Sequence, residues 1–291
     1  MTMSRQLASF TSSHGETGYL SAYDAVLKLW PVPCEESDIM TRYGATHVIA
    51  SGAEGSPPLL LLHATGTSST MWFPNIGALS SAYRVYAVDI MGEPGKSRQS
   101  RLLVDREDCA QWLVDVMQGL GVERTNIAGL SYGGWHALNF SLSFPERIDR
   151  IVALAPGASV LPFSWPVLAL LRLLPYLPFK PNPLKSFFSK GFQPNELFTG
   201  QFASGVQHFR YPAPKESIFT NVFGEDELSS IGSPTLFIVG ENEVIYDPVA
   251  AIEKVDRLIP DVETKLVPNA GHLVSMEQPA LVNEHIVRFL G

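Results

Sequence analysis

Ser131 lies in the sequence GLSYGG, residues 129–134, between an apolar run typical of a buried strand and a segment, 135–144, typical of a helix. In that context the pattern Gly-x-Ser-x-Gly predicts a tight turn that only small residues tolerate and that lifts the serine hydroxyl clear of a sheet. Ser131 is therefore a candidate nucleophile. The alternatives are a bystander serine in a Gly-rich turn, or a dinucleotide site, which needs a glycine spacing that is absent here.

A serine hydroxyl needs a base to take its proton, and imidazole is the usual base near neutral pH. Among the seven histidines, His272 in NAGHLVSMEQP follows the carboxyl end of the last predicted strand. A doubly wound sheet builds its site at that edge, where Ser131 also emerges. His63 follows a strand as well. The other five are expected to be structural or exposed: His14, His47, His136, His208 and His285.

Three carboxylates follow the next-to-last predicted strand in GENEVIYDP, residues 240–248: Glu241, Glu243 and Asp247. Their spacing alone does not identify a catalytic acid. Asp247 precedes Pro248 and a predicted helix, a pattern typical of an N-cap followed by the first helical residue. Asp89, at the end of another strand, is expected to stabilise a turn. The chain has no His-Glu-x-x-His or other clustered ligand set, so no metal site is predicted.

The elements that position these residues alternate between short apolar runs and amphipathic segments of helical length. Strands without polar alternation are covered on both faces, and their alternation with helices predicts βαβ units in a mostly parallel, doubly wound sheet. A helix is expected at 18–30, and an antiparallel hairpin around Gly44 at a sheet edge. The strands are expected near 57–64, 83–90, 125–131, 148–156, 234–240 and 264–271, before a closing helix at 279–290.

Residues 157–214 break this rhythm, because the segment is rich in Pro, Leu and Phe and contains no clear strand. An excursion of this length in a compact domain requires a structure of its own. We predict a helical cap (lid) at 157–214, inserted into a core domain formed by 1–156 and 215–291. The stretch 160–179 has the length of a membrane span, but its four prolines and Arg172 favour a cap over an apolar pocket.

The composition is that of an ordinary globular protein: 291 residues, of which 45% are hydrophobic and 17% charged. A net charge of −8 without any basic run argues against a nucleic-acid partner. Cys34 and Cys109 match no metal or redox spacing, which favours a reducing compartment. The first twenty residues contain no apolar segment typical of a signal peptide, so we predict a cytoplasmic protein without an integral membrane span. The sequence does not indicate an oligomeric state.

The order Ser131, an acid after the next-to-last strand, then His272 after the last strand, resembles the α/β-hydrolase family. HATG from His63 is similar to the oxyanion loop of that family, and DIMGEPGKS from Asp89 is similar to another of its motifs. The hairpin and the GENEVIYDP segment most resemble bacterial carboxylesterase-like members. The resemblance extends over residues 38–290 and says little about the substrate.

The resemblance implies a role for each candidate residue. The family pattern Gly-x-x-Asp places the acid at Glu243, one methylene longer than the usual aspartate, and makes His63 a loop residue. The backbone N–H of Tyr132, with that of Thr65 or Ala64, would form the oxyanion hole. Ala64 departs from the glycine usual after this histidine, which leaves the inward-pointing N–H undecided.

The sequence thus predicts an α/β-hydrolase fold and a serine hydrolase that cleaves carboxylic esters bearing an apolar group, with no cofactor. Ser131, His272 and Glu243 would form the triad. Two alternatives stay open, because fold and triad do not fix the substrate. One is a C–C bond or thioester hydrolase on the same triad, and the other is a ligand-binding protein without turnover on the same scaffold.

Overall fold

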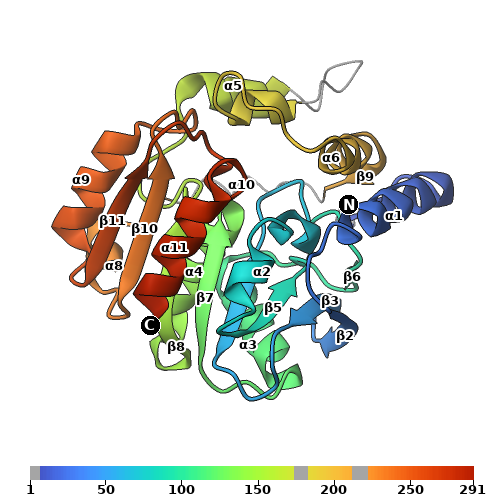
Figure 1. The fold of residues 1–291 in the computed structure, drawn as a ribbon, viewed down its shortest axis with the longest axis horizontal. Coiled ribbons are helices and arrows are strands. Elements are labelled where there is room, and N and C mark those ends of the chain that lie inside the picture. Colours follow the sequence, from blue (N-terminus) through green and yellow to red (C-terminus); the bar gives the residue numbers. More distant parts are fainter. Residues whose placement is uncertain (1–6, 174–182, 212–221) are drawn as a thin grey trace, which may run out of the picture.

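The computed structural model describes residues 7–173, 183–211 and 222–291, which contain one large mixed sheet (Figure 1). Its strand order is β11-β10-β8-β7-β4-β5-β3-β2, with the short β6 beside β3. The strands are β2 (Glu35–Thr41), β3 (Gly44–Ser51), β4 (Pro58–Leu62), β5 (Arg84–Val88), β6 (Arg98–Gln99), β7 (Thr125–Leu130), β8 (Ile148–Leu154), β10 (Thr235–Gly240) and β11 (Val262–Val267).

The six strands from β5 to β11 along this order pair in parallel, whereas β2, β3 and β6 join antiparallel at one end. This confirms the predicted mostly parallel sheet and the edge hairpin around Gly44. The last strand begins at Val262 and not at Thr264, because pairing with β10 starts at Thr235 opposite Val262. Since these strands are parallel, their carboxyl ends share one edge of the sheet.

Helices cover both faces of the sheet, as the sequence predicts for a doubly wound fold. On one face pack α3 (Arg106–Gly119), α4 (Tyr132–Ser143) and α9 (Pro248–Leu258), whose side chains share a core that includes Trp112 and Val255. On the other face pack α2 (Ile76–Leu79) and α11 (Pro279–Leu290), with Ile76 and Ile286 in a second core. Shorter elements complete the domain: η1 (Ser69–Trp72), η2 (Pro145–Arg147), α8 (Glu225–Ser229) and α10 (Val274–Glu277).

The predicted cap segment contributes α5 (Trp165–Leu173), η4 (Pro183–Phe187), α6 (Glu196–His208) and β9 (Phe209–Arg210). In Figure 1, α5 and α6 lie above the sheet, beyond the carboxyl ends of its parallel strands. Part of the 160–179 stretch falls outside the described residues. Within the described ranges, no helix combines the length and the apolar character that crossing a membrane requires. The boundaries of the cap domain stay a prediction.

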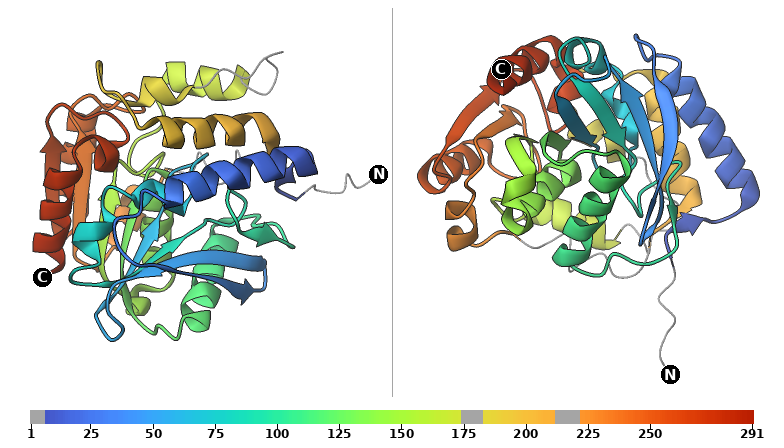
Figure 2. Two further views of the ribbon diagram at one scale, coloured as in Figure 1. Left: turned by 45° about the vertical axis from the view of Figure 1, so that its right-hand side comes forward. Right: turned by 90° about the horizontal axis from the view of Figure 1, so that it is seen from below.

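The N-terminal helix α1 (Ser13–Leu27) begins and ends earlier than the predicted 18–30. It begins earlier because the Ser12 hydroxyl accepts a hydrogen bond from the Gly15 N–H (3.1 Å), so that His14 lies inside a helix. Helix α1 packs against α6, and β1 (Ser9–Phe10) pairs antiparallel with β9. Figure 2 shows α1 and α6 side by side, so the N-terminal segment joins the inserted segment in one layer.

Candidate active site

Ser131 occupies a strained turn between β7 and α4. Its backbone has φ 55° and ψ −111°, a conformation that L-residues rarely adopt and that costs on the order of 1–3 kcal/mol. Neighbouring backbone groups hold the turn: the Ser131 N–H donates to the Leu154 carbonyl (2.9 Å), and the Ser131 carbonyl accepts from the Trp135 N–H (2.9 Å). The serine therefore sits at the carboxyl edge of the sheet, as the sequence predicts.

Glycines make room for this turn. A Cβ at Gly129 would overlap the backbone of Gly133, and a Cβ at Gly133 would overlap the carbonyl of Leu62 at the end of β4. A Cβ at Gly157 would lie 3.2 Å from the Ser131 Oγ. A side chain at Gly129 or Gly133 would displace the turn, and a side chain at Gly157 would fill the space beside the Ser131 hydroxyl.

His272 and Glu243 form a buried pair on two adjacent loops. The His272 Nδ1 lies 2.8 Å from the Glu243 Oε2, and the two side chains are 4% and 0% exposed. Glu243 follows β10 and His272 follows β11, and these two strands are neighbours in the sheet. With Nδ1 engaged by the carboxylate, Nε2 is the ring nitrogen available for proton transfer.

The second oxygen of Glu243 is fixed by its own loop. Oε1 accepts hydrogen bonds from the backbone N–H groups of Val244 (2.8 Å) and Ile245 (2.9 Å), so the carboxylate has a defined orientation toward His272. The neighbouring Tyr246 phenol is buried, and its burial, together with the charge of Glu243, raises its pKa well above the ordinary value. Tyr246 therefore stays neutral next to the pair.

The other two carboxylates of this loop have different partners. The Asp247 Oδ1 accepts from the N–H groups of Val249 (2.9 Å) and Ala250 (3.0 Å), which confirms Asp247 as the N-cap of α9. Glu241 is exposed, and its Oε2 accepts from the Asn269 N–H (3.2 Å). Neither carboxylate is bonded to His272.

His63 holds the loop that follows β4 and is fully buried. Its Nε2 accepts from the Ile90 N–H (2.8 Å), which leaves Nδ1 to donate to the Ala64 carbonyl (2.8 Å). Both nitrogens are thus engaged with backbone groups, as suits a loop residue and not a base. Asp89 is structural as predicted, because it accepts from the N–H groups of Ser69 (2.8 Å) and Lys96 (2.7 Å).

Within the loop 64–67, three of the four backbone N–H groups donate inside the protein. Ala64 donates to the Met71 Sδ (3.4 Å), Gly66 to the Glu93 Oε2 (3.0 Å) and Thr67 to the Ala64 carbonyl (3.2 Å). Among the described residues, the Thr65 N–H has no such acceptor. The left-handed conformation of the loop falls on Gly66 (φ 76°), so alanine at position 64 is not strained.

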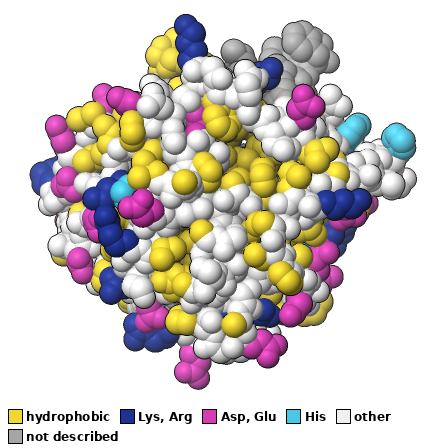
Figure 3. All heavy atoms as spheres, in the orientation of Figure 1, with side chains coloured by type: hydrophobic (Ala, Val, Ile, Leu, Met, Phe, Trp, Pro, Cys, Tyr) yellow, Lys and Arg dark blue, Asp and Glu magenta, His cyan; other side chains and the backbone are white. Residues whose placement is uncertain are grey.

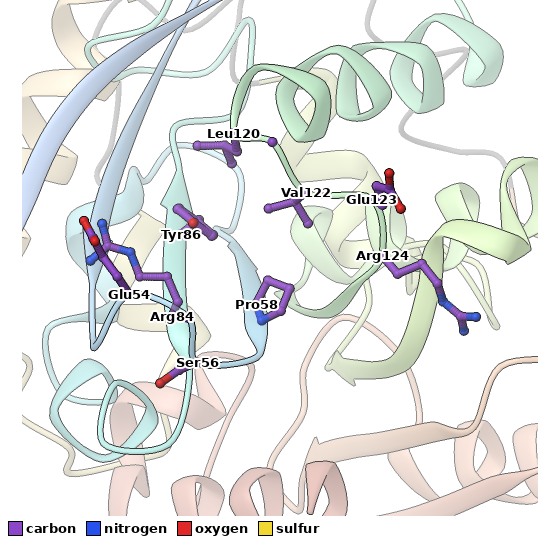
Figure 4. A pocket seen from close by; sticks show the side chains of 11 residues that line it. Glu54, Ser56, Pro58, Arg84, Tyr86, Leu120, Val122, Glu123 and Arg124 are labelled. Carbon is purple, nitrogen blue, oxygen red and sulfur yellow. The ribbon is translucent and has the colours of Figure 1, made fainter.

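A polar groove lies at the opposite edge of the sheet, near the amino ends of β4 and β5 (Figure 4). Its two arginines point away from one another and already have acidic partners, since Arg84 pairs with Glu35 and Arg124 with Asp149. The parallel strands separate this groove from Ser131. We therefore do not connect it with the candidate site.

Two buried polar residues near the site carry no sequence motif of their own. Gln201 of α6 donates to the Ser68 Oγ (2.8 Å) and to the Tyr19 hydroxyl (3.2 Å). Glu277 accepts from the backbone N–H of Gly271, the residue before His272 (2.7 Å). Sequence reasoning did not single out either residue, because their importance depends on contacts between distant segments.

The fold defines the class of protein to which the chain belongs. The family described as alpha/beta hydrolase fold matches residues 57–279, and the chain belongs to that family.

Within the family the chain is similar to carboxylesterases of Bacillus subtilis (strain 168). It is 42% identical to an uncharacterized carboxylesterase, nap, over 93% of this chain and 91% of that protein. It is 40% identical to carboxylesterase YbfK, over 94% and 93% respectively. The crystal structure of naproxen esterase from the same species has a TM-score of 0.90 at 43% identity, covering 96% of this chain and 99% of that one.

Proposed function

We propose that this protein hydrolyses carboxylic esters through an acyl-enzyme, with Ser131, His272 and Glu243 as the catalytic triad. The observation that carries the proposal is the buried His272–Glu243 hydrogen bond at the sheet edge where the strained turn holds Ser131. Similarity to two carboxylesterases at about 40% identity over nearly the whole chain supports the reaction class.

In this mechanism the Ser131 Oγ attacks the ester carbonyl carbon while the His272 Nε2 takes the hydroxyl proton. The tetrahedral intermediate collapses, the C–O bond to the alcohol breaks, and His272 returns the proton to the leaving alkoxide. Water, deprotonated by the same imidazole, then attacks the acyl carbon; the bond from that carbon to the Ser131 Oγ breaks, and the imidazolium returns its proton to Oγ, which releases the acid and free Ser131. Glu243 keeps the proton on Nδ1 and stabilises the imidazolium that forms in each step.

The oxyanion would be held by the backbone N–H of Tyr132 and by that of Thr65. Tyr132 is the first residue of α4, where the helix dipole favours negative charge. We favour Thr65 over Ala64 because the Ala64 N–H is directed at the Met71 sulfur. Each such donor is worth on the order of 10² to 10³ in rate.

An apolar substrate group is favoured by the aromatic rings of the inserted segment. A Cβ at Gly157, beside Ser131, would lie 3.7 Å from the Phe163 ring, and the Phe187 and His272 ring centroids are 5.9 Å apart. Phe202 lies against Gly66 in the candidate oxyanion loop. Figure 3 shows hydrophobic side chains gathered below the cap helices on this face.

A nucleic-acid partner does not fit the net charge of −8, and a cytoplasmic location stays a prediction.

C–C bond cleavage is the alternative reaction on the same triad. A meta-cleavage product hydrolase shares the fold with a TM-score of 0.72 at 22% identity, which is a likeness of fold alone. A ligand-binding role without turnover is the second alternative.

The test combines active-site labelling with a substrate panel. A fluorophosphonate probe should label the wild-type protein and fail to label the Ser131→Ala variant. The circular dichroism spectrum of the variant should equal that of the wild type, which shows that the variant is folded. Nitrophenyl esters of rising chain length and a naproxen ester should be hydrolysed. Folded wild-type protein that is never labelled would refute an activated serine; cleavage of a vinylogous diketone, with all esters untouched, would replace the esterase by a C–C hydrolase.

A further inference from the structure

Glu277 is a buried carboxylate that the proposed mechanism does not use. It is the last residue of α10, five positions after His272, and is 7% exposed. A buried charged side chain is costly unless its oxygens receive hydrogen bonds. The partners of Glu277 therefore indicate what the residue does.

Three donors converge on this carboxylate, and they come from two segments that are far apart in the sequence. The Gly271 N–H donates to Oε1 (2.7 Å), while the Ser189 N–H (2.8 Å) and the Ser189 hydroxyl donate to Oε2. Gly271 belongs to the loop of His272, and Ser189 to the inserted cap segment directly after η4. The carboxylate thus joins the two segments; we call this set of contacts the Glu277 bridge.

The two segments also meet directly at His272. The His272 N–H donates to the Phe187 carbonyl (2.8 Å), and the Phe187 ring packs against the imidazole. A Cβ at Gly271 would lie 2.7 Å from the Phe187 carbonyl oxygen and 2.9 Å from the Ser189 nitrogen, so the two backbones are in close contact. The position of residues 187–189 thereby sets the position of the His272 backbone.

We propose that Glu277 is a positioning residue for the esterase reaction: its bridge between Gly271 and Ser189 fixes His272 at the distance from Ser131 that proton transfer requires. The inference rests on the proposed function. Glu243 orients the imidazole ring from one side, while the Glu277 bridge holds the backbone that carries the ring. A misplacement of a catalytic group by about 1 Å can cost about 10²-fold in rate.

The test is Glu277→Gln, which keeps the side-chain volume but turns an NH₂ group toward one of the N–H donors. We expect kcat to fall by about tenfold to a hundredfold with little change in KM, since substrate contacts are unaffected. Ser189→Ala, which removes one donor of three, should give a smaller fall in kcat and fold normally. Glu227→Gln is the matched control, because Glu227 also accepts from a backbone N–H, that of Gly224, but lies on α8.

A readout without turnover separates this proposal from the proposed function. In NMR spectra, the downfield resonance of the His272 Nδ1 proton shared with Glu243 should be sharp in wild type and broadened by exchange in Glu277→Gln. A lower unfolding free energy with wild-type kcat and an unchanged resonance would make Glu277 merely structural and overturn the inference. If wild type cleaved no ester, the proposed function would fail, yet the resonance would still decide whether Glu277 positions His272.

Discussion

Glu243 and Asp247 lie four residues apart on one loop, yet their carboxylates hold different partners. Glu243 reaches His272 with one oxygen and is fixed by its own backbone with the other. One oxygen of Asp247 accepts hydrogen bonds from the first N–H groups of α9. The role of each carboxylate therefore depends on the hydrogen-bond donors around it and not on whether the residue is a glutamate or an aspartate.

These partners predict opposite effects of two substitutions. Glu243→Ala should lower kcat by about 10³ to 10⁴-fold, because the imidazole loses both its orientation and its countercharge, and should leave the circular dichroism spectrum intact. Asp247→Ala should keep kcat and lower the unfolding free energy by about 1 kcal/mol through loss of the N-cap. Steady-state kinetics and urea denaturation measure the two effects. If Asp247→Ala lost activity while Glu243→Ala stayed active, the catalytic acid would be Asp247 and not Glu243.

Ser131, His272 and the N-cap Asp247 could be predicted because each belongs to a local pattern, whereas Glu243 is assigned through the resemblance to the family. The glycines around Ser131, the strand before His272 and the proline after Asp247 all lie within a few residues of what they explain. Glu277 and Gln201 could not be predicted in this way, since Ser189 lies 88 residues from Glu277 and Ser68 lies 133 residues from Gln201 in the sequence. Sequence spacing does not specify such contacts; only packing does.

The turn between β7 and α4 is the element on which the site is built. Gly133 lies against Leu62 at the end of β4, so the proposed nucleophile, Ser131, is held at the centre of the sheet and not on a flexible loop. The strain at Ser131 is maintained because the backbone of the turn is bonded to β8 on one side and enters α4 on the other. The packing of the turn thus holds Ser131 in a backbone conformation that a serine rarely adopts without such support.

Gly133→Ala tests this packing. The added methyl would overlap the Leu62 carbonyl, and because backbone and not a flexible side chain must move, we expect a loss of more than about 3 kcal/mol of unfolding free energy. Gly200→Ala is the control, since Gly200 lies in α6 with open space around it and should gain about 0.5–1 kcal/mol from helix propensity. Equal stabilities in urea denaturation would show that the turn tolerates a side chain.

The molecule as a whole places the N-terminal helix in the layer that covers the site. The sequence predicted α1 as a separate helix and gave no sign that it packs on α6, because the two are nearly 200 residues apart. The contact is close at Gly15, where a Cβ would lie 2.8 Å from the His208 Cβ. It continues through Tyr19, whose hydroxyl accepts from Gln201, which also donates to Ser68 beside the candidate oxyanion loop.

Through this chain of contacts, α1 should stabilise the layer over the site. Gly15→Leu would push α1 away from α6 and should speed amide hydrogen exchange in α6 and lower kcat/KM, while β7 and β8 keep their protection. Gly18→Leu, on the exposed side of the same helix with nothing within 4 Å of its Cβ position, should change neither. Hydrogen-exchange mass spectrometry on both variants measures this directly. If α6 were equally protected in both, the site would depend on the sheet domain alone, and α1 would contribute nothing to the layer above it.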